Sequence, residues 1–536
     1  MSTLPPPPPS DPAPVEPPRL YAVLDIGATA VRMEIAEIGS DGAIRTVETL
    51  RQSVHLGKDT FTLGRIQQST IEDCVNILRG YRRVMKEYGV EEDRHIRAVA
   101  TSSVREAANR DSFLDRIYIA TKINIDIIEE TEETRLTYLA VQDILTREPL
   151  LQKGDVLVVE VGGGDTELLH MHDGFVSFSN TYRLGALRMR ETLESRGSSN
   201  QQMVDLFLRH IKLTVDQIKR NVPLQKASTL VAVSGDARFA AAEISSTWDH
   251  HNMVRIPTKA FAAFARQIGP LSIDDLVRDH HLSYQEAETL GPSLLAYAEL
   301  AKAFRIQNII VPKSSLRQGL LREVAIGNAW TPEFTEQVWH SALALGHKYA
   351  FDERHGTQVA DLSVRLYHEL QPEHLLPPRY ELILRIAALL HEIGLFINNR
   401  SHHKHSMYAI LNSDLFGMSR HDMLIIALIA RYHRRAMPQP YHEGYATLDR
   451  DDRMVVAKLS AILRVADALD RNHMQQVREI SYTRRPGQFT IYVHDVEDLF
   501  LERVALKEKG RLFDDVYGMR VSLETGTPTE GWLSDV

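Results

Sequence analysis

One local pattern occurs twice in this chain and limits what its N-terminal half can fold into. In each copy an apolar, strand-like run ends at or beside an acid, passes through a glycine turn and resumes as a second strand. The first copy spans residues 21–38 and turns at Asp25-Ile26-Gly27; the second spans residues 156–170 and turns at Glu160-Val161-Gly162-Gly163-Gly164. A weaker turn of the same form lies at residues 231–235. Duplicated units of this kind predict two related α/β halves that face each other across a cleft.

The glycines and acids of these turns indicate a chemistry. A glycine turn after a buried strand lets backbone N–H groups approach an anion closely, because no Cβ stands in the way. The acids Asp25 and Glu160 are placed to hold Mg²⁺ or its water ligands against phosphates. A single glycine after a strand is more often structural, but two such turns with acids favour the handling of adjacent phosphoryl groups.

Length and composition exclude several classes of protein. A chain of 536 residues predicts three or four folding units, and the single cysteine, Cys74, excludes an intramolecular disulfide. We find no apolar run of roughly 18 residues and no secretory signal, so we expect a cytoplasmic protein that does not enter a membrane. With 62 basic and 71 acidic residues the net charge is -9, the wrong sign for indiscriminate binding of nucleic acids, and we expect no DNA partner. A polyanionic substrate remains possible, because the local field in a cleft matters more than net charge.

The character of the sequence changes along the chain. Residues 1–18 hold nine of the 23 prolines and predict a disordered tail, either a solubilising extension or an SH3-type ligand. From about residue 335 strand-like runs disappear and long helical patterns dominate, whereas residues 477–530 return to short strands around a helix at 496–509. The expected domains are the tail (1–18), a first α/β domain (19–136), a second α/β domain (137–330), a helical domain (335–475) and a small α+β unit (476–536).

Several motifs then resemble one known family in ordered succession. Residues 21–38, 100–107, 132–136 and 160–168 resemble the phosphate motifs of the exopolyphosphatase/guanosine pentaphosphate phosphohydrolase (Ppx/GppA) family, and residues 184–188 and 316–320 resemble later markers. The resemblance runs from about residue 20 to 326. It implies an α/β fold of the actin/sugar kinase/heat-shock ATPase type, with the active site between two ribonuclease-H-like domains.

The same resemblance implies roles for individual residues. Glu133 matches the general base that deprotonates the attacking water, and Glu167 matches a second catalytic carboxylate. Asp25 and Glu160 fall at the metal-associated acids. The residues that match substrate-binding positions are Gly27, Thr29, Arg105, Gly162, Gly163, Gly164, Asp165, Ser234 and Gly235. If the motifs did not follow the order seen in the family, we would interpret Glu133 and Arg105 as solvated charges on the face of a helix.

This chain departs from the family pattern at the site. Ala28-Thr29-Ala30 stands where the family usually has Ser-Asn-Ser, and Glu160 stands in place of an Asp, which would move a bound metal by about 1 Å. Asp165, Asp236 and the pair Glu129-Glu130 each add negative charge close to the expected polyanion. Either additional Mg²⁺ compensates, or the site has weakened or changed its ligand.

The helical domain carries a second group of candidate residues. His355, His391, Glu392, His405, His433 and Asp467 follow the order of an HD-domain phosphohydrolase. That resemblance implies histidines and acids around a divalent metal. Because Glu392 stands where that signature has Asp, we favour a packed, hydrogen-bonded helical core over an active metal site.

Basic residues interleave with these histidines: Arg400, Lys404, Arg431, Arg434 and Arg435. They could form a positive stripe that binds a long polyphosphate chain. Equally, they could be solvated charges that favour the dipole at helix ends.

The leading interpretation is a phosphoanhydride hydrolase that uses Mg²⁺ and releases terminal phosphate from inorganic polyphosphate or from guanosine pentaphosphate (pppGpp). One alternative is a regulatory relative that binds polyphosphate or nucleotide without turnover. Another is an HD-type metal phosphohydrolase. The family resemblance further implies a homodimer.

Overall fold

The computed structural model describes residues 18–149, 151–193, 199–222, 224, 227, 229–246, 248, 253–327, 330–494, 496 and 498–527. The proline-rich tail predicted to be disordered lies outside the described residues, apart from Pro18. The chain divides into two compact units. The first unit comprises the residues up to 168 together with 181–329, and the second comprises 169–180 together with 330–536.

The first predicted glycine turn lies in a five-stranded sheet of order β3-β2-β1-β4-β5. Its strands are β1 (Arg19–Ile26), β2 (Ala30–Ile38), β3 (Ile44–Ser53), β4 (Ile96–Ala100) and β5 (Ile125–Ile127). β1 pairs antiparallel with β2 and parallel with β4, so β1 is central and its carboxyl end meets that of β4 at one edge. The Asp25 turn therefore lies where the parallel strands of this sheet end.

Helices cover this sheet because apolar residues recur on one side of each. The elements around it are α1 (Leu56–Leu63), α2 (Gln68–Glu87), η1 (Asp93–His95), α3 (Ser102–Arg105), α4 (Arg110–Thr121), α5 (Glu130–Arg147) and α12 (Leu316–Ile326). Ile71 and Leu78 of α2 and Phe113 of α4 pack with Leu24 and Ile26 of β1 in one buried core. The C-terminal helix of the unit, α12, packs against β1 and α5.

A second sheet repeats the strand order of the first. It contains β6 (Asp155–Val161), β7 (Thr166–His172), β8 (Phe175–Tyr182), β9 (Thr229–Ala232), β10 (Val254–Pro257) and β11 (Asn308–Val311). Its order, β10-β11-β9-β6-β7-β8, matches that of the first sheet with β10 added at one edge. The chain is thus a mixed α/β protein in this part, and the duplicated pattern in the sequence corresponds to two sheets of like order.

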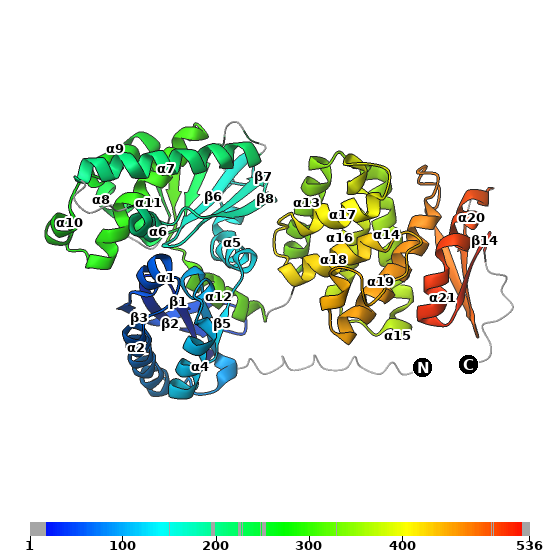
Figure 1. Cartoon of the computed structure of the whole chain (residues 1–536), viewed down its shortest axis with the longest axis horizontal. Helices are drawn as coiled ribbons and strands as arrows, with labels where there is room; N and C mark the ends of the chain where they lie inside the picture. The colour runs from blue at the N-terminus through cyan, green and yellow to red at the C-terminus, as the bar shows by residue number, and fades with distance from the viewer. Residues whose placement is uncertain are drawn as a thin grey trace, which may run out of the picture. The chain divides into compact units, whose positions relative to one another are not determined.

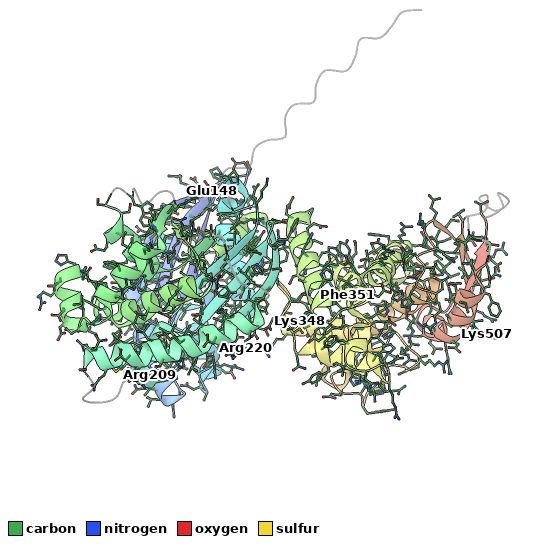
Figure 2. The ribbon with its side chains drawn as sticks, turned by 90° about the horizontal axis from the view of Figure 1, so that it is seen from above. Glu148, Arg209, Arg220, Lys348, Phe351 and Lys507 are labelled. Atoms are coloured by element: carbon green, nitrogen blue, oxygen red, sulfur yellow. The ribbon has the colours of Figure 1, made fainter. Side chains whose placement is uncertain are left out.

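The helices that follow these strands are α6 (Ala186–Leu193), α7 (Asn200–Asn221), α8 (Gly235–Ile244), α9 (Thr258–Ile268), α10 (Ile273–His280) and α11 (Tyr284–Ala303). α11 packs against β6, and α7 and α9 pack against α11 (Figure 1). Arg209 and Arg220 lie along α7 and are exposed (Figure 2). α7 therefore buries one face and leaves a charged face to solvent.

The second unit is mainly helical, as predicted. Its helices are α13 (Pro332–Lys348), α14 (Glu353–Glu369), α15 (Gln371–His374), α16 (Arg379–Leu390), η2 (Ile393–Phe396), α17 (His402–Leu411), α18 (Arg420–Arg431), η3 (Tyr445–Thr447) and α19 (Arg450–Leu469). A three-stranded sheet follows, formed by β12 (Ile480–Arg485), β13 (Gln488–Val493) and β14 (Arg520–Thr525) with α20 (Phe500–Lys509) and α21 (Arg511–Tyr517). Residues 169–180 belong to this unit too: Gln337 of α13 accepts a hydrogen bond from Val176 N at 2.8 Å and donates one to Gly174 O at 3.0 Å.

Some predicted elements differ in extent. After β4 the chain forms two helices, α3 and α4, because Asn109 between them forms two hydrogen bonds of 2.9 Å with the backbone of Ile66. The helix expected over 496–509 begins at Phe500. The domain boundary predicted between residues 136 and 137 falls within α5, which is continuous.

Among the described residues, no helix combines the length and the apolar character that crossing a membrane requires.

A pair of helical glycines tests how closely α12 packs on α5. A Cβ on Gly319 of α12 would lie 2.2 Å from Leu136 O of α5, whereas a Cβ on Gly80 of α2 would meet nothing within 4 Å. We expect Gly319→Ala to lower the free energy of unfolding by about 1–3 kcal/mol, because the helices must separate. Gly80→Ala should raise it by roughly 0.5–1 kcal/mol through helix propensity. Urea unfolding of both variants measures this, and equal effects would contradict the described packing.

Candidate active site

A cavity of about 340 Å³ in the first unit collects most of the residues that the sequence singles out. It is lined by both glycine turns and by the start of α8. The predicted residues that line it are Asp25, Gly27, Thr29, Glu133, Glu160, Gly162, Gly163, Gly164, Asp165, Glu167, Ser234 and Gly235. Residues from four separate stretches of the sequence thus share one cavity.

The two glycine turns face each other across very little space. A Cβ on Gly163 would lie 2.9 Å from the Cβ of Ala28, which follows Gly27 in the first turn. A Cβ on Gly164 would lie 2.3 Å from Ser102 Oγ, and one on Gly185 would lie 2.1 Å from the carbonyl carbon of Gly164. None of these glycines has a positive φ. The residue type is therefore required by close packing rather than by an unusual backbone conformation.

Some backbone amides of the turns donate hydrogen bonds within the turns themselves. Gly27 N donates to Ala30 O at 3.1 Å, and Gly162 N donates to Asp165 O at 2.9 Å. Ser234 Oγ accepts the amide of Ala237 at 3.0 Å and so caps the N-terminus of α8. These groups shape the turns, so we do not assign the Gly27 and Gly162 amides to an anion as the sequence had suggested.

Three glutamates lie close enough at the cavity to influence one another. Thr137 Oγ1 lies 2.9 Å from Glu160 Oε2 and 3.2 Å from Glu167 Oε2, and one hydroxyl can donate to only one of them. Burial, reinforced by neighbouring carboxylates, raises the pKa of Glu133 to about 7 and that of Glu160 to about 7. Burial and the charges of Glu133 and Glu160 also raise the pKa of Glu167. The cavity thus holds carboxyl groups that gain protons near neutral pH.

Arginines neutralise the acid at position 165, which the sequence had marked as an unfavourable charge. Arg105 NH2 lies 3.4 Å from Asp165 Oδ2, and Arg188 NH2 lies 3.4 Å from Asp165 Oδ1. Arg105 NH1 also contacts Glu133 Oε2 at 3.2 Å and Ile128 O at 2.8 Å. Arg188 Nε donates to Gly164 O at 2.7 Å, which holds the second turn in place. Asp165 is therefore paired, and Arg105 orients Glu133.

Further arginines line the cavity, and the sequence reasoning missed them. Arg32, Arg51, Arg238 and Arg317 are all part of its wall. Arg32 NH1 lies 3.2 Å and Arg317 NH1 3.7 Å from Asp25 Oδ2, while Arg238 NH1 donates to Ser314 O at 2.7 Å. Arg317 falls in a marker motif that the sequence already displays, which is the signal that could have identified it. Guanidinium groups facing carboxylates make the cavity suited to an anion that also carries a cation.

The remaining acidic substitutions have different surroundings. Asp236 is half-buried and accepts a hydrogen bond from Thr289 Oγ1 at 3.4 Å. Burial raises the pKa of Asp236 to about 6, against the opposing effect of its hydroxyl partners. The side chain of Glu130 is 46% exposed and lies 4.0 Å from Arg105 NH2, so water screens much of its charge.

Carboxylate oxygens are the ligands that Mg²⁺ prefers, and Asp25, Glu133, Glu160 and Glu167 supply them here. Among the residues that the structure describes, however, no three of these acids bring ligand atoms within 4.8 Å of one another. Mg²⁺ commonly keeps several waters and binds through one or two carboxylates plus substrate phosphates. These four acids fit a Mg²⁺ ion that is bound by one or two carboxylates together with waters and phosphates. They do not fit an ion enclosed by protein ligands alone.

In the second unit the structure assembles five of the six predicted residues. His355, His391, Glu392, His433 and Asp467 lie together, but His405 does not. Two histidines that the sequence analysis did not select join them: His402, which begins α17, and His473, which follows α19. Of the five interleaved basic residues, Arg400, Lys404, Arg434 and Arg435 are exposed, and Arg431 is half-buried beside Met407.

Comparison with known proteins gives consistent matches along the chain. A model described as the Ppx/GppA phosphatase family matches residues 35–325, more than half of the chain, and a model described as Ppx/GppA phosphatase, domain III, matches residues 339–510. The helical module is thus matched as domain III of this family, and the HD-like assignment stays a prediction.

Curated relatives and a solved structure match as well. A guanosine-5'-triphosphate,3'-diphosphate pyrophosphatase of Aeromonas hydrophila is 26% identical over 450 residues, covering 83% of this chain and 86% of the relative. The protein of that name from Aliivibrio fischeri is 25% identical over 455 residues, covering 83% and 87%. The crystal structure of an exopolyphosphatase from Cytophaga hutchinsonii matches with a TM-score of 0.52 at 18% identity, covering 58% of this chain and 98% of that one. At that identity the structural match concerns the fold alone.

The raised carboxyl pKa values predict how stability depends on pH. A group whose pKa is raised in the folded state stabilises the fold below its unfolded pKa of about 4.3, and this stabilisation is lost as pH rises through the folded value. With Glu133 and Glu160 near 7, the free energy of unfolding of the first unit should fall between about pH 4.5 and 8 in the presence of a chelator. Glu160→Gln should raise it at pH 8 by about 1–3 kcal/mol.

Urea unfolding across this pH range measures the effect. Glu87→Gln, at the exposed end of α2, is the matched control and should leave the slope unchanged. If the free energy of unfolding of Glu160→Gln depended on pH in the same way as that of the wild type, burial would not raise the pKa of this carboxyl.

Proposed function

Because this chain belongs to the Ppx/GppA phosphatase family, we propose that it hydrolyses phosphoanhydride bonds and releases orthophosphate from the end of a phosphate chain. The observation that carries this proposal is the make-up of one cavity, in which Glu133 stands among further carboxylates and arginines. Arg105, which is not part of the lining, contacts Glu133 from behind the cavity wall. A terminal phosphoryl group needs positive groups to hold its oxygens and a base to activate water. Both kinds of group line the same wall.

Glu133 is the general base in this proposal. Its pKa of about 7 lets the carboxylate accept a proton from water at neutral pH, and a base with a pKa near the working pH is the most effective. The Arg105 contact at 3.2 Å fixes one of its oxygens, so that the other is free to face a water molecule. Glu167, linked to Glu160 through Thr137, is the second catalytic carboxylate of the proposal.

Asp25 and Glu160 are the proposed holders of Mg²⁺, which would neutralise charge on the phosphate oxygens when bound. Arg317 and Arg32 contact Asp25 and reach the same cavity, where their guanidinium groups can bind two phosphate oxygens at once. The Gly163 and Gly164 amides are the candidates for backbone donors, with Thr29 beside them.

Two substrates fit this chemistry, inorganic polyphosphate and pppGpp. Both end in a run of phosphoryl groups, and the named relatives include guanosine-5'-triphosphate,3'-diphosphate pyrophosphatases and an exopolyphosphatase. The cavity groups identified here recognise phosphates, which the two substrates share, so the proposal covers both.

The test is orthophosphate release with Mg²⁺ from long polyphosphate and from pppGpp, with ATP as a competitor. Glu133→Gln should lower kcat by about 10²- to 10⁴-fold, the usual contribution of a general base, with little effect on substrate binding. The control Glu87→Gln should match the wild type. Tight binding of polyphosphate without release by the wild type would favour a regulatory relative. Activity lost in His391→Ala but kept in Glu133→Gln would move the chemistry to the second unit.

The arginines that line the cavity, Arg32, Arg51, Arg238 and Arg317, lead to a separate prediction about substrate binding. Arg317→Gln removes one charged donor set from the cavity, so KM for polyphosphate should rise about 10- to 100-fold, as expected when a charge-assisted hydrogen bond is lost. Arg209→Gln, on the exposed face of α7, is the matched control. Steady-state kinetics measure both variants, and an unchanged KM in Arg317→Gln would remove this residue from the binding site.

A further inference from the structure

A buried cluster of histidines lies in the second unit and plays no part in the proposed hydrolysis. It contains His355 of α14, His391 and Glu392 after α16, His402 of α17, His433 after α18 and Asp467 of α19. The four imidazoles and Asp467 are buried, with exposures from 0% to 7%. With His473, which follows α19, their ligand atoms form three groups within 4.8 Å: His355, His391 and Asp467; His355, Glu392 and His473; and Glu392, His402 and His433.

The backbone fixes which nitrogen of each ring carries the proton. His391 Nδ1 lies 2.6 Å from Ala388 O, and His433 Nδ1 lies 2.6 Å from Ala430 O. His402 Nδ1 lies 3.2 Å from Asn399 O. A carbonyl oxygen can only accept, so each of these Nδ1 atoms donates, and each neutral ring turns a bare Nε2 lone pair away from the backbone.

His355 has the same arrangement with a carboxylate behind it. Its Nδ1 lies 2.8 Å from Asp470 Oδ2, which accepts the Nδ1 proton. A histidine held in this way by an acid has the orientation and basicity of a metal ligand. In the neutral form of each ring, all four Nε2 atoms are therefore acceptors.

These lone pairs are left without donors. His355 Nε2 and His391 Nε2 are buried and have no hydrogen-bond partner. His402 Nε2 and His433 Nε2 lie 3.2 Å apart, and two lone pairs at that distance repel unless a proton or a cation lies between them. Leaving buried acceptors unsatisfied costs about 1–3 kcal/mol each, so the cluster is arranged for a positive ion.

The acids complete the donor set. Asp467 Oδ1 lies 3.8 Å from His355 Nε2 and 3.9 Å from His391 Nε2. Glu392 places Oε2 3.9 Å from His355 Nε2 and Oε1 3.9 Å from His402 Nε2. Bonds of about 2.0–2.2 Å to one ion put its ligands roughly 3–4 Å apart. The longer arm of Glu392, which counted against a metal in the sequence, here reaches both halves of the cluster.

A lysine enters the cluster from the α+β part of the unit. Lys509, the last residue of α20, contacts Asp467 Oδ2 with its ammonium group. That oxygen is then unavailable for bridging to a second ion, and the ammonium charge opposes another divalent cation nearby. Lys507 lies on the same helix and is exposed (Figure 2).

We propose that this cluster binds a single divalent transition-metal ion such as Zn²⁺, with Lys509 in the position that a second ion would need. His355, His391 and Asp467 hold the ion, and Glu392 lies beside them, between His355 and His402. Imidazole-rich donors select ions such as Zn²⁺ over Mg²⁺, which prefers oxygen ligands. The proposal does not depend on the hydrolytic function of the first unit.

The experiment titrates the full-length protein, stripped with a chelator, with Zn²⁺ in excess Mg²⁺, so that Mg²⁺ occupies the carboxylates of the first unit. Bound metal per chain is measured by equilibrium dialysis, and Co²⁺ absorption reports imidazole ligation. The wild type should bind one ion. His355→Ala and His391→Ala should each weaken binding more than 100-fold, and His405→Ala, outside the cluster, should not change it.

Two further variants separate the claims. Asp470→Asn keeps every ligand but removes the carboxylate behind His355, and should weaken binding 10- to 100-fold even if the alanine variants fail to fold. Lys509→Met should bind two ions, whereas Lys507→Met should bind one. A wild type that binds no Zn²⁺, or binding that survives Asp470→Asn and both alanine substitutions unchanged, overturns the metal site. A Lys509→Met protein that still binds one ion overturns the role of the lysine.

Discussion

The two glycine turns of the first unit approach each other so closely that a β-carbon on Gly163 would press on Ala28. The position of the acids at the cavity depends on this approach. It brings the carboxyl end of β1 opposite that of β6, and with them the acids Asp25 and Glu160. Gly185 packs equally tightly on Gly164, so the second turn is enclosed by the protein itself. Such packing leaves little freedom for the turns to move independently.

Bringing these strand ends together concentrates like charges, and the structure balances them in two ways. Arg105 and Arg188 flank Asp165, and Arg32 and Arg317 approach Asp25. Repulsion among Glu133, Glu160 and Glu167 is instead reduced by partial protonation. Burial disfavours their charged forms and so raises their pKa values. The acidic substitution at Asp165 is thus accommodated by two arginines of this chain. At this position the structure adds a further outcome to those that the sequence left open, which were additional Mg²⁺ and a weakened or changed site.

The sequence predicted features that depend on neighbouring residues in the chain. Strand–turn–strand units and long amphipathic helices have local periodicities, so β1, β6 and the helical region from about residue 335 could be predicted. The arginines that line the cavity could not, because an arginine has the same appearance in sequence whether it faces solvent or a cavity. The break between α3 and α4 depends on Asn109 bonding to Ile66, 43 residues away. His402 and His405 lie one turn apart on α17, and only the direction of the His402 ring toward His433 distinguishes them.

The order of residues along the chain does not follow the division into units. Residues 169–180, which form most of β7 and β8, group with the helices that begin 150 residues later, and Gln337 ties them there through Val176 and Gly174. Glu167, which lines the cavity, lies two residues before this segment. A chain ended after residue 329 would lose α13, which holds the hairpin through Gln337. Where this chain is cut thus decides whether the strands that follow Glu167 keep their packing partner.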